Sequence, residues 1–221
     1  MLTKQSLDFL KDLSQNNNRD WYHANKERYN SDLKLPFEAF IGELIEAYKS
    51  IDPEIAIDAK AAVFRIYRDT RFSKDKTPYK THVGAVISRY GRKGHEYPGN
   101  YVHVEQGRLM LGGGAYFMDK NNLQKVREHI MKYPKTFSKL IENTDFVKKY
   151  GEIKGEKNKR IPKEFREFAE EQALIFNKQF YFMAELDPKH ILGEKGVDFA
   201  MDYFRAGQTL TSFLKEGMGL E

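Results

Sequence analysis

The chain has no cysteine among its 221 residues. This absence excludes disulfide bonds, thiolate catalysis, and zinc or iron–sulfur sites built from cysteine. Long apolar runs are also missing, and the first residues lack the apolar stretch of a signal peptide. A hydrophobic content of 40% nevertheless excludes a disordered chain. We therefore expect a folded cytoplasmic protein with no membrane partner.

Net positive charge is concentrated in one region of the sequence. The whole chain carries a net charge of +5, and residues 65–108 alone carry ten Lys and Arg against four Asp and Glu. Within that region, residues 65–80 (RIYRDTRFSKDKTPYK), hereafter the basic loop, are the densest part. Their charged residues are Arg65, Arg68, Arg71, Lys74, Lys76 and Lys80, against Asp69 and Asp75. A local excess of cations predicts an anionic partner.

Apolar spacing predicts the order of helices and strands. Helices are expected over residues 4–15 and 19–34 and again after Pro36. Alternating apolar residues predict strands over 61–67, 81–90, 100–107, 108–117 and 180–186, with helices after Asp119 and a last helix through Val197 and Phe204. This pattern predicts an α+β fold with a central, mostly antiparallel sheet flanked by N- and C-terminal helices. We expect a single domain over 1–221, with a helical part at 1–58, the sheet at 59–118 and a mainly helical part at 119–221.

The basic loop has two interpretations. Arginine makes bidentate contacts with phosphate, and the interleaved aromatic residues offer stacking surfaces for a base or sugar. On this interpretation the ligand-binding residues are Arg65, Arg68, Asp69, Arg71, Lys76, Tyr79 and Lys80. Alternatively, Asp69 and Asp75 pair with the cations and pin the loop to the sheet as an internal salt-bridge clamp. Two acids cannot pair six cations, which favours a ligand.

The Gly112-Gly113-Gly114 triplet is a second candidate for anion binding. Backbone N–H groups around Gly113 and Gly114 suit an anion-binding nest. A bulge or a tight bend at the end of a strand explains the same glycines equally simply. The triplet is neither a P-loop nor a dinucleotide-binding fingerprint, because the residues that those motifs require do not follow it.

The candidates for proton transfer are His82, Tyr79 and His103. His82 follows the basic loop, and His103 is on the polar face of its strand, where a general acid or base is accessible. No histidine pair has a helical metal-ligand spacing, and no HExxH motif is present. The sequence therefore predicts no metal site and no cofactor, and it leaves open whether the protein is an enzyme.

A longer pattern runs through these residues. The combination RxxRDxRF, KxPYK, PGNYVH (98–103) and GGGAY (112–116) resembles the signature of a bacterial family called domain of unknown function 2461. Its N-terminal part is similar to residues 9–22, and a later Pro-Lys-Gly-Phe element is matched with Glu164 in place of glycine. The resemblance implies no catalytic residue, substrate or cofactor, because the family is uncharacterised.

Three functions follow from these observations. The first is binding of an anionic small molecule such as phosphate, a nucleotide or a phosphorylated metabolite, with a hydrolase or transferase as its enzymatic form. The second is a non-enzymatic nucleic-acid-binding module, whose affinity would fall steeply with salt. The third is a structural or interaction protein in which the basic loop is only a clamp.

Overall fold

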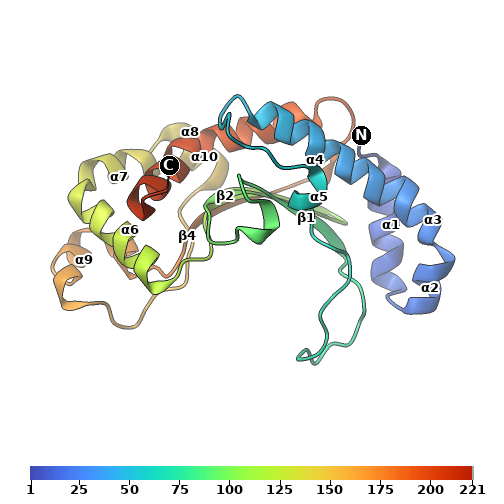
Figure 1. Cartoon of the computed structure of the whole chain (residues 1–221), viewed down its shortest axis with the longest axis horizontal. Coiled ribbons are helices and arrows are strands. Elements are labelled where there is room, and N and C mark those ends of the chain that lie inside the picture. The colour runs from blue at the N-terminus through green and yellow to red at the C-terminus, as the bar shows by residue number, and fades with distance from the viewer. Residues whose placement is uncertain (221) are drawn as a thin grey trace. The chain divides into compact units, whose positions relative to one another are not determined.

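The chain forms two compact units, whose helices and strands are labelled in Figure 1. The computed structural model describes residues 1–220. Unit 1 consists of Met1–Lys93, Tyr101–Leu111 and Glu185–Asp202, and unit 2 consists of Gly94–Asn100, Gly112–Ala184 and the described residues from Tyr203 onward. Because the two units alternate along the chain, neither is one continuous stretch. The single-domain organisation stays a prediction.

The secondary structure confirms the predicted α+β fold, with a four-stranded antiparallel sheet in the order β1-β2-β3-β4 and helices around it. The strands are β1 (His82–Ile87), β2 (Gly99–Glu105), β3 (Arg108–Ala115) and β4 (Phe180–Leu186). The α-helices are α1 (Lys4–Gln15), α2 (Arg19–Ala24), α3 (Lys26–Arg28), α4 (Leu35–Tyr48), α5 (Ala59–Ala62), α6 (Lys120–Lys132), α7 (Pro134–Ile141), α8 (Thr144–Tyr150), α9 (Phe168–Glu171) and α10 (Gly196–Met218). Shorter turns are the π-helical η1 (Tyr29–Lys34) and the 3-10 turns η2 (Gly91–Lys93), η3 (Lys163–Phe165), η4 (Ala173–Phe176) and η5 (Pro188–Ile191). No helix within residues 1–220 combines the length and the apolar character that a membrane-spanning helix needs.

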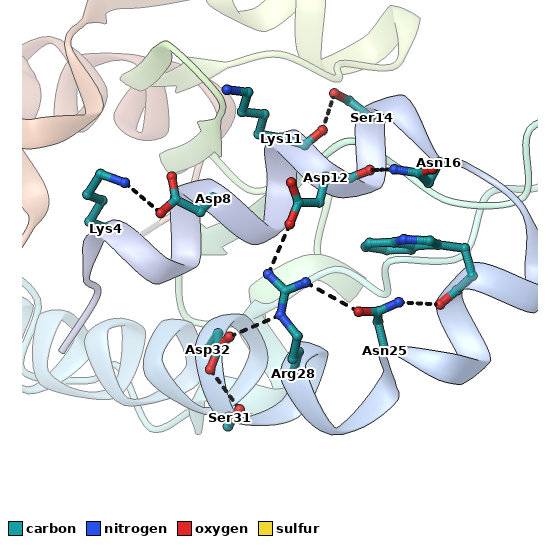
Figure 2. Close-up of polar contacts among 11 residues, drawn as sticks. Lys4, Asp8, Lys11, Asp12, Ser14, Asn16, Asn25, Arg28, Ser31 and Asp32 are labelled. Atoms are coloured by element: carbon teal, nitrogen blue, oxygen red, sulfur yellow. Dashed lines mark hydrogen bonds and ion pairs between the residues drawn. The ribbon is translucent and has the colours of Figure 1, made fainter.

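The first helices of unit 1 are joined by an apolar face and a polar network. Phe9 and Leu13 of α1 are fully buried, and the Phe9 ring packs 5.7 Å from Trp21 of α2. Figure 2 shows Arg28 between α1 and η1: its guanidinium bonds Asp12 at 3.0 Å, lies 3.6 Å from Asp32 and donates to Asn25 at 3.2 Å. These ion pairs are partly exposed, so burial of the aromatic face stabilises this corner more than the charges do.

Two predicted elements differ from the observed ones. The predicted strand at 61–67 is wrong, because the Asp58 side chain caps α5 by accepting from the Ala61 N–H at 2.7 Å. The rest of that segment is extended and makes isolated antiparallel bridges, from Val63 to Ala85 and from Tyr67 to Tyr79. The single helix predicted for 19–34 is divided into α2, α3 and the π-helical turn η1.

The central hairpin and the last strand match the sequence pattern. Strands β2 and β3 are joined by a tight turn in which Gly107 has a φ of +79°, a value that favours glycine. Strand β4 has the predicted bounds, and it lies beside β3 in the sheet. Helices α6, α7 and α8 occupy the connection between β3 and β4, as predicted for the residues after Asp119.

The core of unit 2 is built around aromatic side chains from α7, α8, β4 and α10. The Phe182 ring packs 5.2 Å from Phe146 and 4.6 Å from Tyr150, and Phe137 packs 5.6 Å from Phe213. The buried Arg127 of α6 donates to the backbone carbonyls of Ile175 at 2.9 Å and Asn177 at 3.1 Å, and this pairing satisfies a charge that is otherwise costly to bury.

Candidate functional site

The basic loop projects away from β1 and α5 (Figure 1), and it is fixed at its base. The two arms of the loop pair through Arg68 N–H to Pro78 O at 2.9 Å and Lys80 N–H to Ile66 O at 2.8 Å. The side-chain amide of Asn17, in the connection between α1 and α2, donates to Tyr79 O at 2.9 Å and accepts from Tyr79 N–H at 3.1 Å. The arms therefore start from a fixed position, and the segment beyond Arg68 extends from it.

Aromatic stacking adds to this anchor. Tyr79 is only 3% exposed, and its ring stacks on Tyr22 of α2 with centroids 4.1 Å apart. Tyr67 lies against both rings, at 5.4 Å from Tyr79 and 5.9 Å from Tyr22. Burial raises the pKa of Tyr22 far above its ordinary value, raises that of Tyr29 to about 12, and raises that of Tyr79. Tyr79 is therefore a neutral phenol at physiological pH and serves the loop as an anchor.

Both acids of the basic loop pair with an arginine. Arg71 binds Asp69 through Nη2 at 2.7 Å and Nε at 3.0 Å, and Arg68 binds Asp75 at 2.5 Å. The hydrogen bond from Arg71 lowers the pKa of Asp69 to about 2. The pKa of Asp75 is lowered to about 2, mainly by the hydrogen bond from the backbone N–H of Thr77 and then by the hydrogen bond from Arg68. Both pairs join residues within the loop itself, and its role as a clamp that pins the loop to the sheet stays a prediction.

Four cations remain without such a partner. Within residues 1–220, no carboxylate lies within ion-pairing distance of Arg65, Lys74, Lys76 or Lys80. Lys76 donates to the backbone carbonyl of Thr70 at 2.9 Å, and the Lys80 ammonium lies 5.2 Å from the Phe64 ring centre. Burial is the main factor that lowers the pKa of Lys80, and the positive charge of the nearby Arg65 lowers it further. The loop thus keeps a surplus of positive charge after its internal pairs are formed.

An open cleft of about 470 Å³ lies between the basic loop and the connection from α1 to α2. Its lining residues are Asn17, Asn18, Arg19, Thr70, Lys76, Thr77 and Pro78. Two of them are cations and none is a carboxylate. Beyond the cleft, Phe72 is 97% exposed, with the Arg71 guanidinium 5.9 Å from its ring centre. The loop therefore offers a cationic cleft on one part and an exposed aromatic ring on another.

Gly113 and Gly114 lie in unit 2, where both are buried. A Cβ at Gly113 would stand 2.9 Å from Asn100 Oδ1 and 3.0 Å from the Phe182 ring. Gly114 has a φ of +99°, and a Cβ there would stand 2.4 Å from the carbonyl oxygen of Phe180. The close approach of β4 accounts for these glycines, while their role in ligand binding stays a prediction.

His82 and His103 meet on neighbouring strands of unit 1. Their rings stack with centroids 4.2 Å apart, and His103 is 8% exposed. The pKa of His82 is lowered to about 4, mainly by burial and secondly by the neighbouring His103. Burial also lowers the pKa of His103. His103 Nε2 lies 3.3 Å from Glu105 Oε2, and Glu105 in turn bonds Arg108 at 2.5 Å. Both imidazoles are therefore neutral at physiological pH.

Two parts of this arrangement were missed by sequence reasoning. Asn17 and Arg19 lie where the first two predicted helices meet and are not among the predicted site residues, although the Asn17 amide bonds the loop 62 residues away. Glu105 is likewise absent from the predicted site residues. The sequence signal was its spacing of two from His103, which places both side chains on one face of a strand.

The comparisons with known proteins give one match. The model of the family described as Conserved hypothetical protein (DUF2461) matches residues 5–213. No curated protein and no solved structure matches the chain. Because the family match covers nearly the whole chain, including the basic loop and the strands with His82 and His103, this protein belongs to the DUF2461 family.

Proposed function

We propose that the protein binds a phosphate-bearing ligand at the cleft beside the basic loop. The observation that carries the proposal is the cleft lining, with Arg19 and Lys76 as cations and no carboxylate. A phosphate dianion matches two cations, and the side-chain amide of Asn18 and the hydroxyl of Thr70 are neutral polar groups on the same surface. The ligand class is phosphate, a nucleotide or a phosphorylated small molecule.

The internal ion pairs support this function because they hold the loop in place before a ligand arrives. Arg68 binds both Asp75 and the backbone carbonyl of Thr77, so the residues beside the cleft are restrained. A restrained site loses less conformational entropy on binding than a free loop does. The clamp and the binding site are then two functions of one loop, with Arg68 positioning and Lys76 contacting the ligand.

Nucleic acid is the second candidate, and Phe72 is the observation that favours it. The Phe72 ring is 97% exposed and lies beside the Arg71 guanidinium, so both are available to a partner. Single-stranded nucleic acid is bound by this combination of an aromatic platform and flanking cations. In this form of the proposal, the exposed part of the loop contacts bases and the cleft contacts the backbone.

A binding panel tests the proposal. Inorganic phosphate, nucleotides, sugar phosphates and short single-stranded DNA and RNA are added to the wild type, and the melting temperature is measured. A ligand at about 100 times its dissociation constant stabilises a protein by about 2.7 kcal/mol. For a chain of this length, that corresponds to roughly 5–10 °C. We expect stabilisation to be lost in Lys76→Gln and Arg19→Gln and kept in Lys26→Gln, an exposed position on α3 with the same change of charge.

Salt dependence separates the two ligand classes. Contacts to four phosphates of single-stranded nucleic acid predict a loss of affinity of about 50-fold between 50 and 200 mM salt, whereas one phosphate predicts only a few-fold loss. Phe72→Ala should weaken nucleic-acid binding and leave phosphate binding unchanged. If no ligand stabilises the wild type and Arg68→Gln alone lowers the melting temperature strongly, the loop is only a clamp and the proposal fails.

Catalysis is the enzymatic form of the same proposal. His82 and His103 are neutral proton acceptors, so a hydrolase or transferase acting on the bound ligand would lose turnover in a folded His82→Asn variant while keeping its affinity. Equal loss of turnover and affinity would contradict a chemical role. The cytoplasmic location stays a prediction.

A further inference from the structure

A second group of polar side chains lies on β1 and β2, apart from the cleft lining. His82 is the first residue of β1, and His103 and Glu105 are two residues apart on β2, so they share one side of that strand. One donor atom from each of the three side chains lies within 4.8 Å of the other two. Two imidazoles and one carboxylate form a donor set typical of divalent transition metals.

One atom of this group lacks the partner that burial requires. His103 Nε2 is buried and has no hydrogen-bond partner of standard geometry, and Glu105 Oε2 lies 3.3 Å from it. Buried polar atoms are almost always satisfied, and an exception indicates a missing water, ion or ligand. A tetrahedral ion with bonds of about 2.0–2.1 Å holds its ligand atoms roughly 3.3 Å apart. The separation of Nε2 and Oε2 thus already suits a shared metal ion.

The remaining atoms of the two β2 residues are held by neighbours. The Tyr101 hydroxyl lies 3.2 Å from His103 Nδ1, which leaves Nε2 for a metal. Arg108 binds Glu105 Oε1 at 2.5 Å, which leaves Oε2. Such outer contacts orient metal ligands in proteins and tune their affinity.

The local charge sets the expected strength of the site. Glu105 is its one anionic ligand, and Arg108 and Lys80 act electrostatically on the histidines. These cations repel a dication and so weaken its binding. The balance favours an exchangeable ion with an open coordination position over a permanently bound structural ion.

We propose that His82, His103 and Glu105 form a three-ligand site for a first-row divalent transition metal ion. The fourth position is open to water or to an anionic ligand, as in catalytic metal sites with three protein ligands. This site revises the sequence-based expectation of no metal, and it does not depend on the proposed phosphate cleft.

The test measures Zn²⁺ binding to the chelator-treated full chain without a tag, by competition with a chromophoric chelator. We expect one Zn²⁺ per chain, at least 10-fold weaker binding in His82→Asn and Glu105→Gln, and a smaller loss in Tyr101→Phe. His23→Asn is the matched control, because this exposed histidine of unit 1 lies outside the group and should leave binding unchanged.

Co²⁺ provides a second readout through the visible absorption of a tetrahedral site, which a non-specific surface ion lacks. His103→Gln risks unfolding because His103 is buried, whereas Glu105→Gln preserves shape and keeps the test decisive. The proposal is overturned if the wild type binds no Zn²⁺, or if folded His82→Asn and Glu105→Gln variants bind it as tightly as the wild type. In that case the three side chains form only a polar network between strands.

Discussion

Four glycine-to-alanine substitutions separate two reasons why this fold needs glycine. Gly42 lies in α4 with open space around it, and Gly107 combines a φ of +79° with open space. Gly112 has no left-handed backbone, but a Cβ there would stand 2.3 Å from the carbonyl oxygen of Phe182. Gly114 combines both problems, with a φ of +99° and a Cβ 2.4 Å from the Phe180 oxygen.

The expected changes in the free energy of unfolding follow from these environments. Alanine at position 42 should stabilise the protein by about 1 kcal/mol, because glycine is a poor helix former. Alanine at 107 should destabilise it by about 1–2 kcal/mol through the backbone alone. Overpacking against β4 should cost about 1–3 kcal/mol at 112, and the sum at 114 should reach roughly 2–5 kcal/mol. That sum lowers the melting temperature by roughly 4–20 °C.

Urea and thermal unfolding of the four variants measure this order. The expected ranking of stability is Gly42→Ala above the wild type, then Gly107→Ala and Gly112→Ala with overlapping losses, and Gly114→Ala lowest. If Gly114→Ala unfolds no more easily than Gly107→Ala, the close approach of β4 does not constrain the triplet. Anion binding by the backbone around Gly113 and Gly114 would then be the favoured explanation of these glycines.

Three further predictions concern single side chains. The stability of the metal-free protein should fall as pH drops from about 6.5 to about 4, because His82 binds a proton in the unfolded state that the folded state excludes. The lowered pKa of His82 corresponds to about 3 kcal/mol of stability. His82→Gln should therefore flatten the profile of stability against pH in that range. Asn17→Ala removes both amide bonds to Tyr79 and should cost about 1–3 kcal/mol in urea unfolding, whereas Asn121→Ala, at an exposed helical position, should cost nothing. Arg127→Met should cost about 2–5 kcal/mol because it leaves two buried carbonyls without donors; a loss below 1 kcal/mol would show that water replaces the guanidinium.

Local patterns were enough to predict most of the fold. The stripe of Phe37, Phe40, Ile41 and Leu44 predicted α4, and alternation with a glycine turn predicted the β2–β3 hairpin. The error at 61–67 came from interpreting an alanine-rich, apolar run by strand propensity alone. Asp58 was available in the sequence as a helix cap, and it starts α5, which includes the first two residues of that segment.

The candidate sites were harder to predict because they depend on contacts between distant residues. The sequence located the basic loop and its charge surplus, but the hydrogen bonds between Asn17 and Tyr79 follow from tertiary packing. The group of His82, His103 and Glu105 depends on how β1 and β2 align, and a shift of one residue would turn one strand's ligands to the other face. Periodicity within one strand reveals the pair on β2 and not its partner on β1.

The interleaving of the two units has a consequence for how the chain folds during synthesis. Unit 1 includes Glu185–Asp202, so all residues up to Asp202 must be synthesised before its last segment is available. Unit 2 begins at Gly94 and also uses the residues after Tyr203. Domains made of one continuous stretch fold as soon as they emerge, whereas this chain must keep its early aromatic faces from aggregating until its end arrives. We therefore expect truncation after residue 184 to prevent both units from folding, and not only the second.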